Sequence, residues 1–134
     1  MIDRLFYIVY NSYYKHGKYK NDIPPLTVFG IFCVATFSIL ISIAYAIYLL
    51  KDPTYFRTHR APSKTIYFIS AALITYLLFY YKKRYKSIYD KFKDIEHYDT
   101  FKGKFIAFFI MVLIIISPIV FMLIYNKLYF GAWV

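Results

Sequence analysis

The stretch FIAFFIMVLIIISPIVFMLIY, residues 105–125, contains no Asp, Glu, Lys, Arg or His. Two similar stretches precede it, LTVFGIFCVATFSILISIAYAIYLL at 26–50 and TIYFISAALITYLLFYY at 65–81. The three stretches are 21, 25 and 17 residues long in the order given. A helix rises about 1.5 Å per residue, so they match a hydrocarbon layer about 30 Å thick, although the 17-residue stretch is barely long enough. The sequence therefore predicts an all-α integral membrane protein with three transmembrane helices.

The segments between the spans are polar and basic. The 134 residues are 60% hydrophobic, yet the net charge is +10, and all of it lies outside the spans. The remaining pieces, 1–25, 51–64, 82–104 and 126–134, are too short to close hydrophobic cores of their own. We expect one membrane domain over 1–134 whose basic residues contact anionic lipid headgroups, and no nucleic acid partner.

The distribution of Lys and Arg predicts an orientation. Residues 1–25 and 82–104 carry 12 of the 17 basic residues, and residues 51–64 and 126–134 carry five. The positive-inside rule places the first two segments in the cytoplasm and the C-terminus outside, in a bacterial inner membrane or, alternatively, an organellar inner membrane. A rival interpretation makes 65–81 a re-entrant or tilted hairpin.

Aromatic residues cluster where the spans should leave the hydrocarbon. Amphipathic rings prefer the headgroup region, so these are predicted to be interface anchors. They are Tyr45, Tyr48, Tyr80, Tyr81, Tyr125, Tyr129, Phe130 and Trp133.

The first 14 residues have the pattern of an amphipathic helix. Ile2, Leu5, Phe6, Val9 and Tyr13 recur at helical spacing, with polar residues on the other faces. We expect an interfacial helix on the membrane surface, the alternative being a frayed tail.

The loop at 82–104 carries a second apolar stripe. Its members fall at helical spacing, so span two is predicted to continue about four turns into the cytoplasm as one helix. The stripe needs cover, from the N-terminal helix, a second copy or another protein. The predicted partner or lipid contacts are Tyr85, Ile88, Tyr89 and Phe92 of the stripe and the basic Lys82, Lys83, Arg84 and Lys86. Asp99 or Thr100 is expected to cap span three.

Small residues inside the spans predict where helices pack. In lipid, close packing and hydrogen bonds drive helix association more than hydrophobicity does. Span one places small residues four apart, and span two has a small-residue face; we expect the two faces to meet within one chain first and between copies second. The residues are Gly30, Ser38, Ser42 and Ala46 in span one and Ser70, Ala71 and Thr75 in span two.

Span three contains a helix-breaking pair, Ser117 and Pro118. Proline removes a backbone hydrogen bond and clashes with the preceding turn. We expect a kink whose freed carbonyl is met by Ser117, a neighbouring helix or water.

Catalytic and transport chemistry have no support in the sequence. Ionisable residues at membrane depth mark carriers, pumps and voltage sensors, and these spans contain none. Phosphate loops, nucleophile elbows and metal motifs are also missing, and the single Cys33 excludes an intrachain disulfide. Asp94, His97 and Asp99 offer ligands for a divalent metal, but their spacing matches no metal motif and a solvated loop is favoured. We expect no enzyme, no catalytic residue, no metal and no cofactor.

Two segments carry a resemblance. The lead-in Lys20-Asn21-Asp22-Ile23-Pro24 and the exit from Tyr80-Tyr81-Lys82-Lys83-Arg84-Tyr85 to Ile88-Tyr89 resemble a pattern common in small bacterial multi-span membrane proteins. The resemblance implies a helical membrane fold and no particular activity.

Taken with the absence of catalytic chemistry, the apolar stripe and the small-residue face favour action by protein–protein contact. We expect an accessory, anchoring, regulatory or immunity subunit with a membrane or cytoplasmic protein partner. One alternative is a self-assembling, membrane-permeabilising effector of the holin or defence type, lined by Ser38, Ser42 and Thr75 and acting as a homo-oligomer. A third is a supernumerary subunit of a large membrane complex.

Overall fold

The fold of the chain was analysed in a computed structural model, which describes residues 1–15, 24–51, 63–95, 98 and 100–131. Every regular element in these ranges is helical. In chain order the elements are α1 (Ile2–Tyr14), α2 (Pro24–Lys51), α4 (Lys64–Thr75), the π-helical segment η2 (Tyr76–Tyr80), the 3-10 turn η3 (Tyr81–Lys83), α5 (Arg84–Phe92) and α7 (Phe101–Phe130).

The predicted all-α class is confirmed. Three helical stretches are long and apolar enough to cross a membrane, and they contain or overlap the three uncharged segments of the sequence. Helix α7 begins as predicted, because the Thr100 side chain accepts a hydrogen bond from the Gly103 backbone N–H at 3.2 Å. It ends at Gly131, whose φ of 71° is a left-handed conformation that suits glycine.

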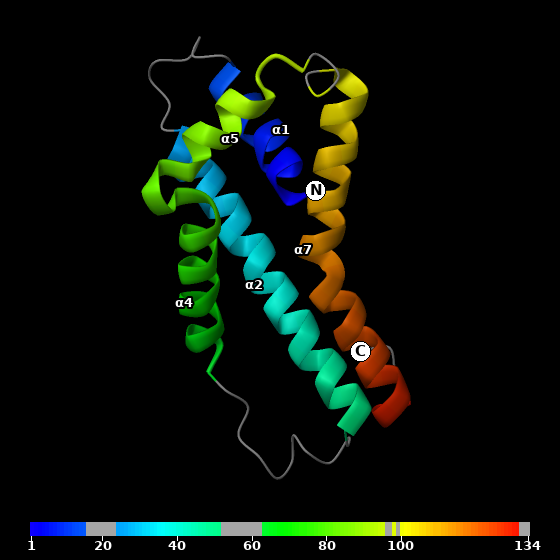
Figure 1. The fold of residues 1–134 in the computed structure, drawn as a ribbon. Helices are drawn as coiled ribbons and strands as arrows, with labels where there is room; N and C mark the ends of the chain where they lie inside the picture. The colour runs from blue at the N-terminus through cyan, green and yellow to red at the C-terminus, as the bar shows by residue number, and fades with distance from the viewer. Residues whose placement is uncertain (16–23, 52–62, 96–97, 99, 132–134) are drawn as a thin grey trace.

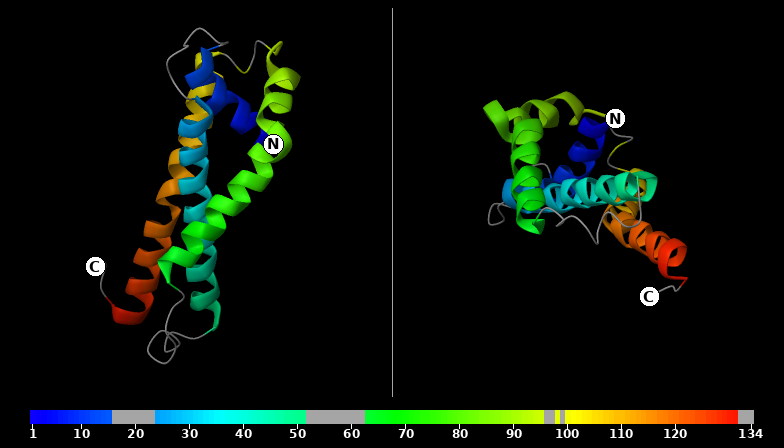
Figure 2. Two further views of the ribbon diagram at one scale, coloured as in Figure 1. Left: turned by 90° about the vertical axis from the view of Figure 1, so that its left-hand side faces the viewer. Right: turned by 90° about the horizontal axis from the view of Figure 1, so that it is seen from below.

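The helices form an open arrangement around α2. Figure 1 shows α2 running obliquely between α4 and α7, with α1 and α5 gathered at one end of the molecule. Seen from below in Figure 2, α2 and α4 cross steeply. Helix α1 packs against α2, α5 and α7 where the spans diverge, so it fills the space that they leave at that end.

The middle of α1 is buried on all sides. Six consecutive residues, Phe6 to Asn11, are buried, which covers every face of a helix with 3.6 residues per turn. The sequence predicted the helix but described a surface helix with one apolar face. The location of α1 at a membrane interface stays a prediction.

The predicted straight continuation of span two is wrong. Lys82 and Lys83 have φ angles of 52° and 58°, so the chain turns sharply after η2 and α5 lies across the end of the bundle (Figure 1). Each non-glycine residue in this conformation costs about 1–2 kcal/mol. The turn places Ile88 and Phe92 against α1, and burying such side chains gains about 1.5–3 kcal/mol each. Burial outweighs the strain of the turn.

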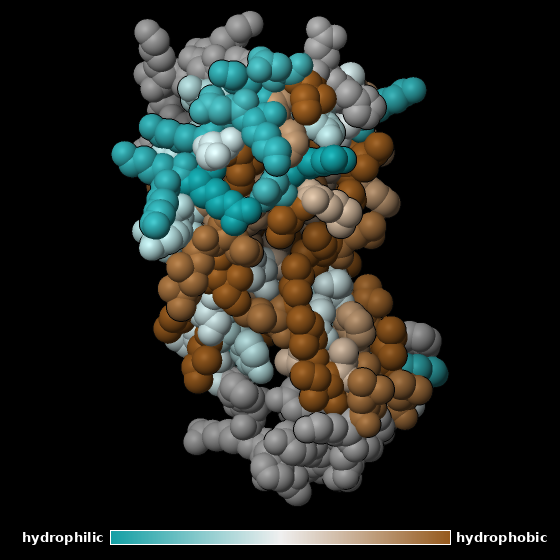
Figure 3. Space-filling view, viewed as in Figure 1, coloured by the Kyte–Doolittle hydropathy of each residue, from teal (hydrophilic) through white to brown (hydrophobic). Residues whose placement is uncertain are grey.

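Polar and apolar residues separate along the molecule. In Figure 3 hydrophilic residues cover the end that contains α1 and α5, and hydrophobic residues cover the described helices below it. This end carries ten basic and three acidic residues among those that the structure describes. The basic ones are Arg4, Lys15, Lys82, Lys83, Arg84, Lys86, Lys91, Lys93, Lys102 and Lys104, and the acidic ones are Asp3, Asp90 and Asp94.

Candidate functional site

An aromatic cluster joins α1 to α5, and we call these two helices with Tyr98 the aromatic cap. The Tyr7 ring lies 5.9 Å from the rings of both Tyr89 and Phe92, and Tyr10 lies 6.0 Å from Tyr85. Centroid separations of 4.5–7 Å are typical of favourable aromatic pairs. Of the covers that the sequence left open for the α5 stripe, the structure thus places the N-terminal helix over it.

The predicted contact residues of α5 now divide into two groups. Ile88 and Phe92 are only 3% and 8% exposed, and Tyr85 and Tyr89 are half-buried. The four basic residues are exposed: Lys82, Lys83, Arg84 and Lys86. A partner that binds this end therefore meets charge rather than the apolar stripe.

Phe6 connects the cap to the spans. Its ring stacks on Phe79 of η2 with centroids 4.4 Å apart and lies 5.2 Å from Phe32 of α2. The Tyr80 hydroxyl donates a hydrogen bond to the carbonyl oxygen of Pro25, which ties η2 to the first turn of α2. The cap and these two helix ends therefore form one packed unit.

Charged and phenolic groups of the cap interact at its surface and in its interior. Arg84 Nη2 lies 3.2 Å from Asp3 Oδ1, so one ion pair joins α5 to α1. Burial, with smaller contributions from Tyr14 and other neighbouring tyrosines, raises the pKa of Tyr10 to about 12. The Tyr10 phenol is therefore neutral at physiological pH.

Hydroxyl pairs link α2 to each of the other spans. Thr36 Oγ1 lies 3.1 Å from Thr75 Oγ1, and Thr75, which is fully buried, also donates to the carbonyl oxygen of Phe32 at 3.4 Å. On the other side of α2, Ser42 Oγ lies 2.7 Å from Ser117 Oγ of α7. In lipid such contacts stabilise helix association by about 0.6 kcal/mol on average.

The serine pair also supplies the hydrogen-bond donor that Pro118 lacks. Pro118 has no N–H, so the carbonyl oxygen of Ile114 loses its helical donor. The Ser117 hydroxyl donates to that oxygen at 2.8 Å, which is one of the three partners that the sequence left open, and α7 continues as one helix through Pro118. Ser42 Oγ is also 2.8 Å from the Ser38 carbonyl oxygen. Two hydroxyl protons cannot fill three contacts at once. With Ser117 donating to Ile114, the single Ser42 proton has two acceptors within reach, the Ser38 carbonyl oxygen and Ser117 Oγ.

The small residues of span one do not all face span two. Gly30 is exposed, with open space where a side chain would lie, while Ser42 faces α7. Residues four apart rotate about 40° per step around a helix of 3.6 residues per turn, so a long stripe leaves its face. Ala46 and Ser70 are half-buried, Ser38 is buried, and Ala71 and Thr75 are fully buried.

The predicted interface anchors are spread over different environments. Tyr81 is 50% exposed, but Tyr125 is buried and its ring lies 6.4 Å from that of Tyr45. Tyr80 is half-buried, and its hydroxyl bonds to Pro25. The side chains of Tyr48, Tyr129, Phe130 and Trp133 lie outside the described residues, as do His97 and Asp99 of the candidate metal site. Asp94 is exposed, and no group of three metal-ligating side chains occurs among the described residues.

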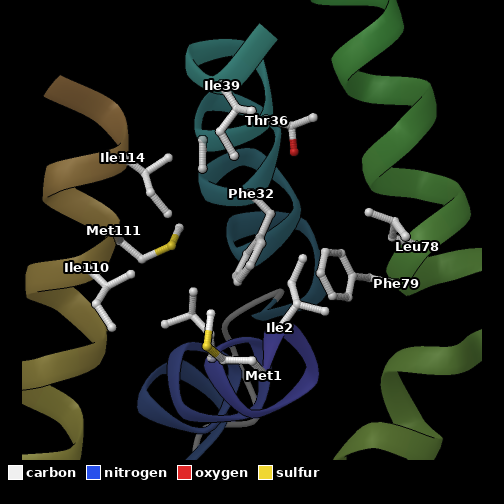
Figure 4. Close-up of a pocket in the computed structure, with 12 residues that line it drawn as sticks. Met1, Ile2, Phe32, Thr36, Ile39, Leu78, Phe79, Ile110, Met111 and Ile114 are labelled. Atoms are coloured by element: carbon white, nitrogen blue, oxygen red, sulfur yellow. The ribbon is translucent and has the colours of Figure 1, made fainter. Parts of the chain in front are cut away.

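An apolar pocket lies beneath α1, and no sequence pattern had indicated it. Its volume is about 220 Å³, and Figure 4 shows it bounded by α2, α7, the η2 side of span two and the start of α1. The buried side chains in its wall are Phe32, Ala35, Phe79 and Met111.

The fold and these features define a small helical protein with three candidate membrane spans and a basic aromatic cap. No protein-family model matches the chain, and neither the curated proteins nor the solved structures gave a match.

Proposed function

We propose that the protein is a small integral membrane subunit that acts by protein contact, as an accessory, anchoring, regulatory or immunity subunit. Its contact surface is the basic outer side of the aromatic cap. The observation that supports this is the division of α5 into a buried apolar side and an exposed basic side. The partner is therefore expected to present an acidic surface, because complementary charge gives specificity and fast association.

The cap suits such a role because its helices are held in place. Rings from α1 contact α5 along its length, from Tyr85 to Phe92, so the backbone positions that carry the lysines of α5 keep a fixed arrangement. A fixed cationic surface loses less entropy on binding than flexible lysines would. The opposite end of the bundle has only Lys64 and Lys127 among its described basic side chains.

The cap is expected in the cytoplasm, in agreement with the positive-inside rule. The single cysteine, Cys33, is only 4% exposed, so a Cys33→Ala background allows labelling of introduced thiols. In intact cells a membrane-impermeant maleimide should modify Lys127→Cys and leave Lys86→Cys unmodified until the cells are opened. The reverse pattern would contradict the orientation.

The protein contact itself is tested with charge reversal. The double variant Lys86→Glu/Lys93→Glu changes the cap, and Lys64→Glu/Lys127→Glu is the matched control at the other end. After cross-linking in native membranes, a stoichiometric partner should copurify with the wild type and the control and be lost from the cap variant. Recovery of the wild-type chain alone, with and without cross-linking in several mild detergents, would overturn the proposal.

The permeabilising alternative has less support. Its expected lining residues, Ser38, Ser42 and Thr75, are buried within a single chain. Normal growth and an intact membrane potential on induced expression would agree with the contact role, and collapse of the potential would favour the alternative. A supernumerary subunit of a large membrane complex would differ from the proposed accessory subunit only in the identity of its partner.

A further inference from the structure

The pocket beneath α1 opens sideways at the depth of the spans. Phe32 and Ala35 in its wall are each only 4% exposed, but three other lining side chains are exposed: Ile39 by 43%, Leu78 by 36% and Ile110 by 39%. These three residues come from α2, η2 and α7, all within candidate membrane spans. The opening therefore faces the hydrocarbon of the surrounding bilayer.

The lining selects for hydrocarbon rather than water. Of the twelve residues that line the pocket, Thr36 alone has a polar side chain, and its hydroxyl already faces Thr75 at 3.1 Å. A bound water needs about two to four polar partners, and apolar cavities of about 150 Å³ stay dry and accept benzene. An unfilled space would also forfeit dispersion contacts along its lining.

A second hollow continues the pocket toward the polar end. It measures about 200 Å³, shares Met1, Leu5 and Ile110 with the first, and is also lined by Arg4, Tyr98 and Gly103. The Arg4 guanidinium lies 5.9 Å from the centre of the Tyr98 ring, and it forms no ion pair with any carboxylate that the structure describes. The two hollows together thus have an apolar inner part and a cationic outer end.

We propose that these hollows bind one anionic glycerophospholipid from the bilayer. One acyl chain fills the pocket between α2, η2 and α7, and the phosphate lies at Arg4. The combination fits a lipid because its apolar part and its anionic group are joined in one molecule at the spacing of the membrane interface. This site is separate from the basic outer side of α5, so it does not depend on the proposed protein contact.

The acyl-chain position is tested by filling the pocket. The full-length protein is purified in mild detergent, exchanged into an equimolar mixture of phosphatidylglycerol and phosphatidylethanolamine, and examined by native mass spectrometry. The wild type should retain one phospholipid per chain. Ile39→Trp should lower this occupancy about tenfold, equal to about 1.4 kcal/mol. Ile43→Trp, on the same helix but outside the pocket and 50% exposed, should match the wild type.

The headgroup position is tested with charge removal. Arg4→Gln should reduce the preference for phosphatidylglycerol over phosphatidylethanolamine about fivefold, since one interfacial cation contributes about 1 kcal/mol. Lys93→Gln, which removes a charge from α5, should leave the preference unchanged.

Three outcomes would overturn the proposal: no retained lipid in the wild type, equal occupancy in Ile39→Trp and Ile43→Trp, or an unchanged preference in Arg4→Gln. If Ile39→Trp does not elute like the wild type, Leu78→Trp fills the same opening from η2.

Discussion

The aromatic cap and the spans are held together by different interactions. In the cap, six consecutive residues of α1 are buried and rings from two helices contact one another. In the spans, only 33%, 17% and 11% of the most apolar window of each candidate helix is buried inside the molecule. Contacts there include two hydroxyl pairs, one on each side of α2.

Lipid around the candidate spans and water around the cap would account for this difference. Burial of apolar surface drives association where water is the alternative, so the cap folds by covering rings. Lipid tails are as apolar as leucine, so the spans gain little from burial and rely on close packing and hydrogen bonds. Loss of a buried ring should therefore dominate the destabilisation in the cap, and loss of a hydrogen bond should dominate it in the spans.

The largest effect is expected for Phe6→Ala. Phe6 is fully buried and its ring contacts Phe79 and Phe32, so truncation should destabilise the cap by about 3–5 kcal/mol. Unfolding by SDS titration in mixed micelles, followed by circular dichroism, measures the change, and trypsin should cleave the cap lysines faster. The matched control is Phe109→Ala on α7, where the ring is 55% exposed and truncation should cost less than about 0.5 kcal/mol. Equal effects would mean that the cap is not held by burial.

The next effect is expected at the serine pair. Ser117→Ala leaves the Ile114 carbonyl oxygen without a donor inside the third candidate span, at a cost of about 1–2 kcal/mol. Pro118→Ala restores a backbone N–H at the position that normally bonds this oxygen. In the Pro118→Ala background, Ser117→Ala should therefore cost only about 0.6 kcal/mol in the same titration, the average contribution of a hydroxyl contact such as the one it loses with Ser42. A cost that is unchanged by Pro118→Ala would show that Ser117 acts mainly through Ser42.

Features set by local pattern could be predicted from the sequence. The three spans follow from long runs without charge, and α1 follows from its helical spacing. The sequence narrows the cap of span three to Asp99 or Thr100, and the donor to the carbonyl freed by Pro118 to Ser117, a neighbouring helix or water. Each depends on residues at most a few positions apart or on a whole uncharged run. Such features need no knowledge of which helices are neighbours.

Features set by long-range contacts could not be predicted. Nothing local favours left-handed conformations at Lys82 and Lys83, because lysine disfavours them. The strain of the turn is offset only when α5 packs against α1. The pocket likewise needs α1, α2, η2 and α7 to be placed together. The small residues of α2 are divided between α4 and α7 because residues four apart drift around the axis of a long helix.

A smaller effect of opposite sign is expected at that turn. Lys83 has a φ of 58°, so Lys83→Gly should remove strain and stabilise the cap by about 1 kcal/mol, whereas Lys83→Val should destabilise it. Lys93 at the end of α5 has a φ of −58°, and there Lys93→Gly should bring no gain. The SDS midpoints of the three variants test this, and a loss of stability in Lys83→Gly would mean that the lysine side chain holds the turn.

The smallest effect is expected for the ion pair between α1 and α5. The Asp3 and Arg84 side chains are 30% and 47% exposed, and pairs of this kind contribute about 0.2–1 kcal/mol. Asp3→Asn should therefore lower stability slightly in dilute salt and have no effect near 1 M salt, where charges are screened within about 3 Å. Asp90→Asn, which removes the exposed pair with Lys93 inside α5, serves as the comparison. A large effect of Asp3→Asn that survives high salt would mean that charge, and not the rings, positions α5 after the turn. In that case the contrast between a cap held by burial and spans held by hydroxyl pairs would no longer describe the molecule.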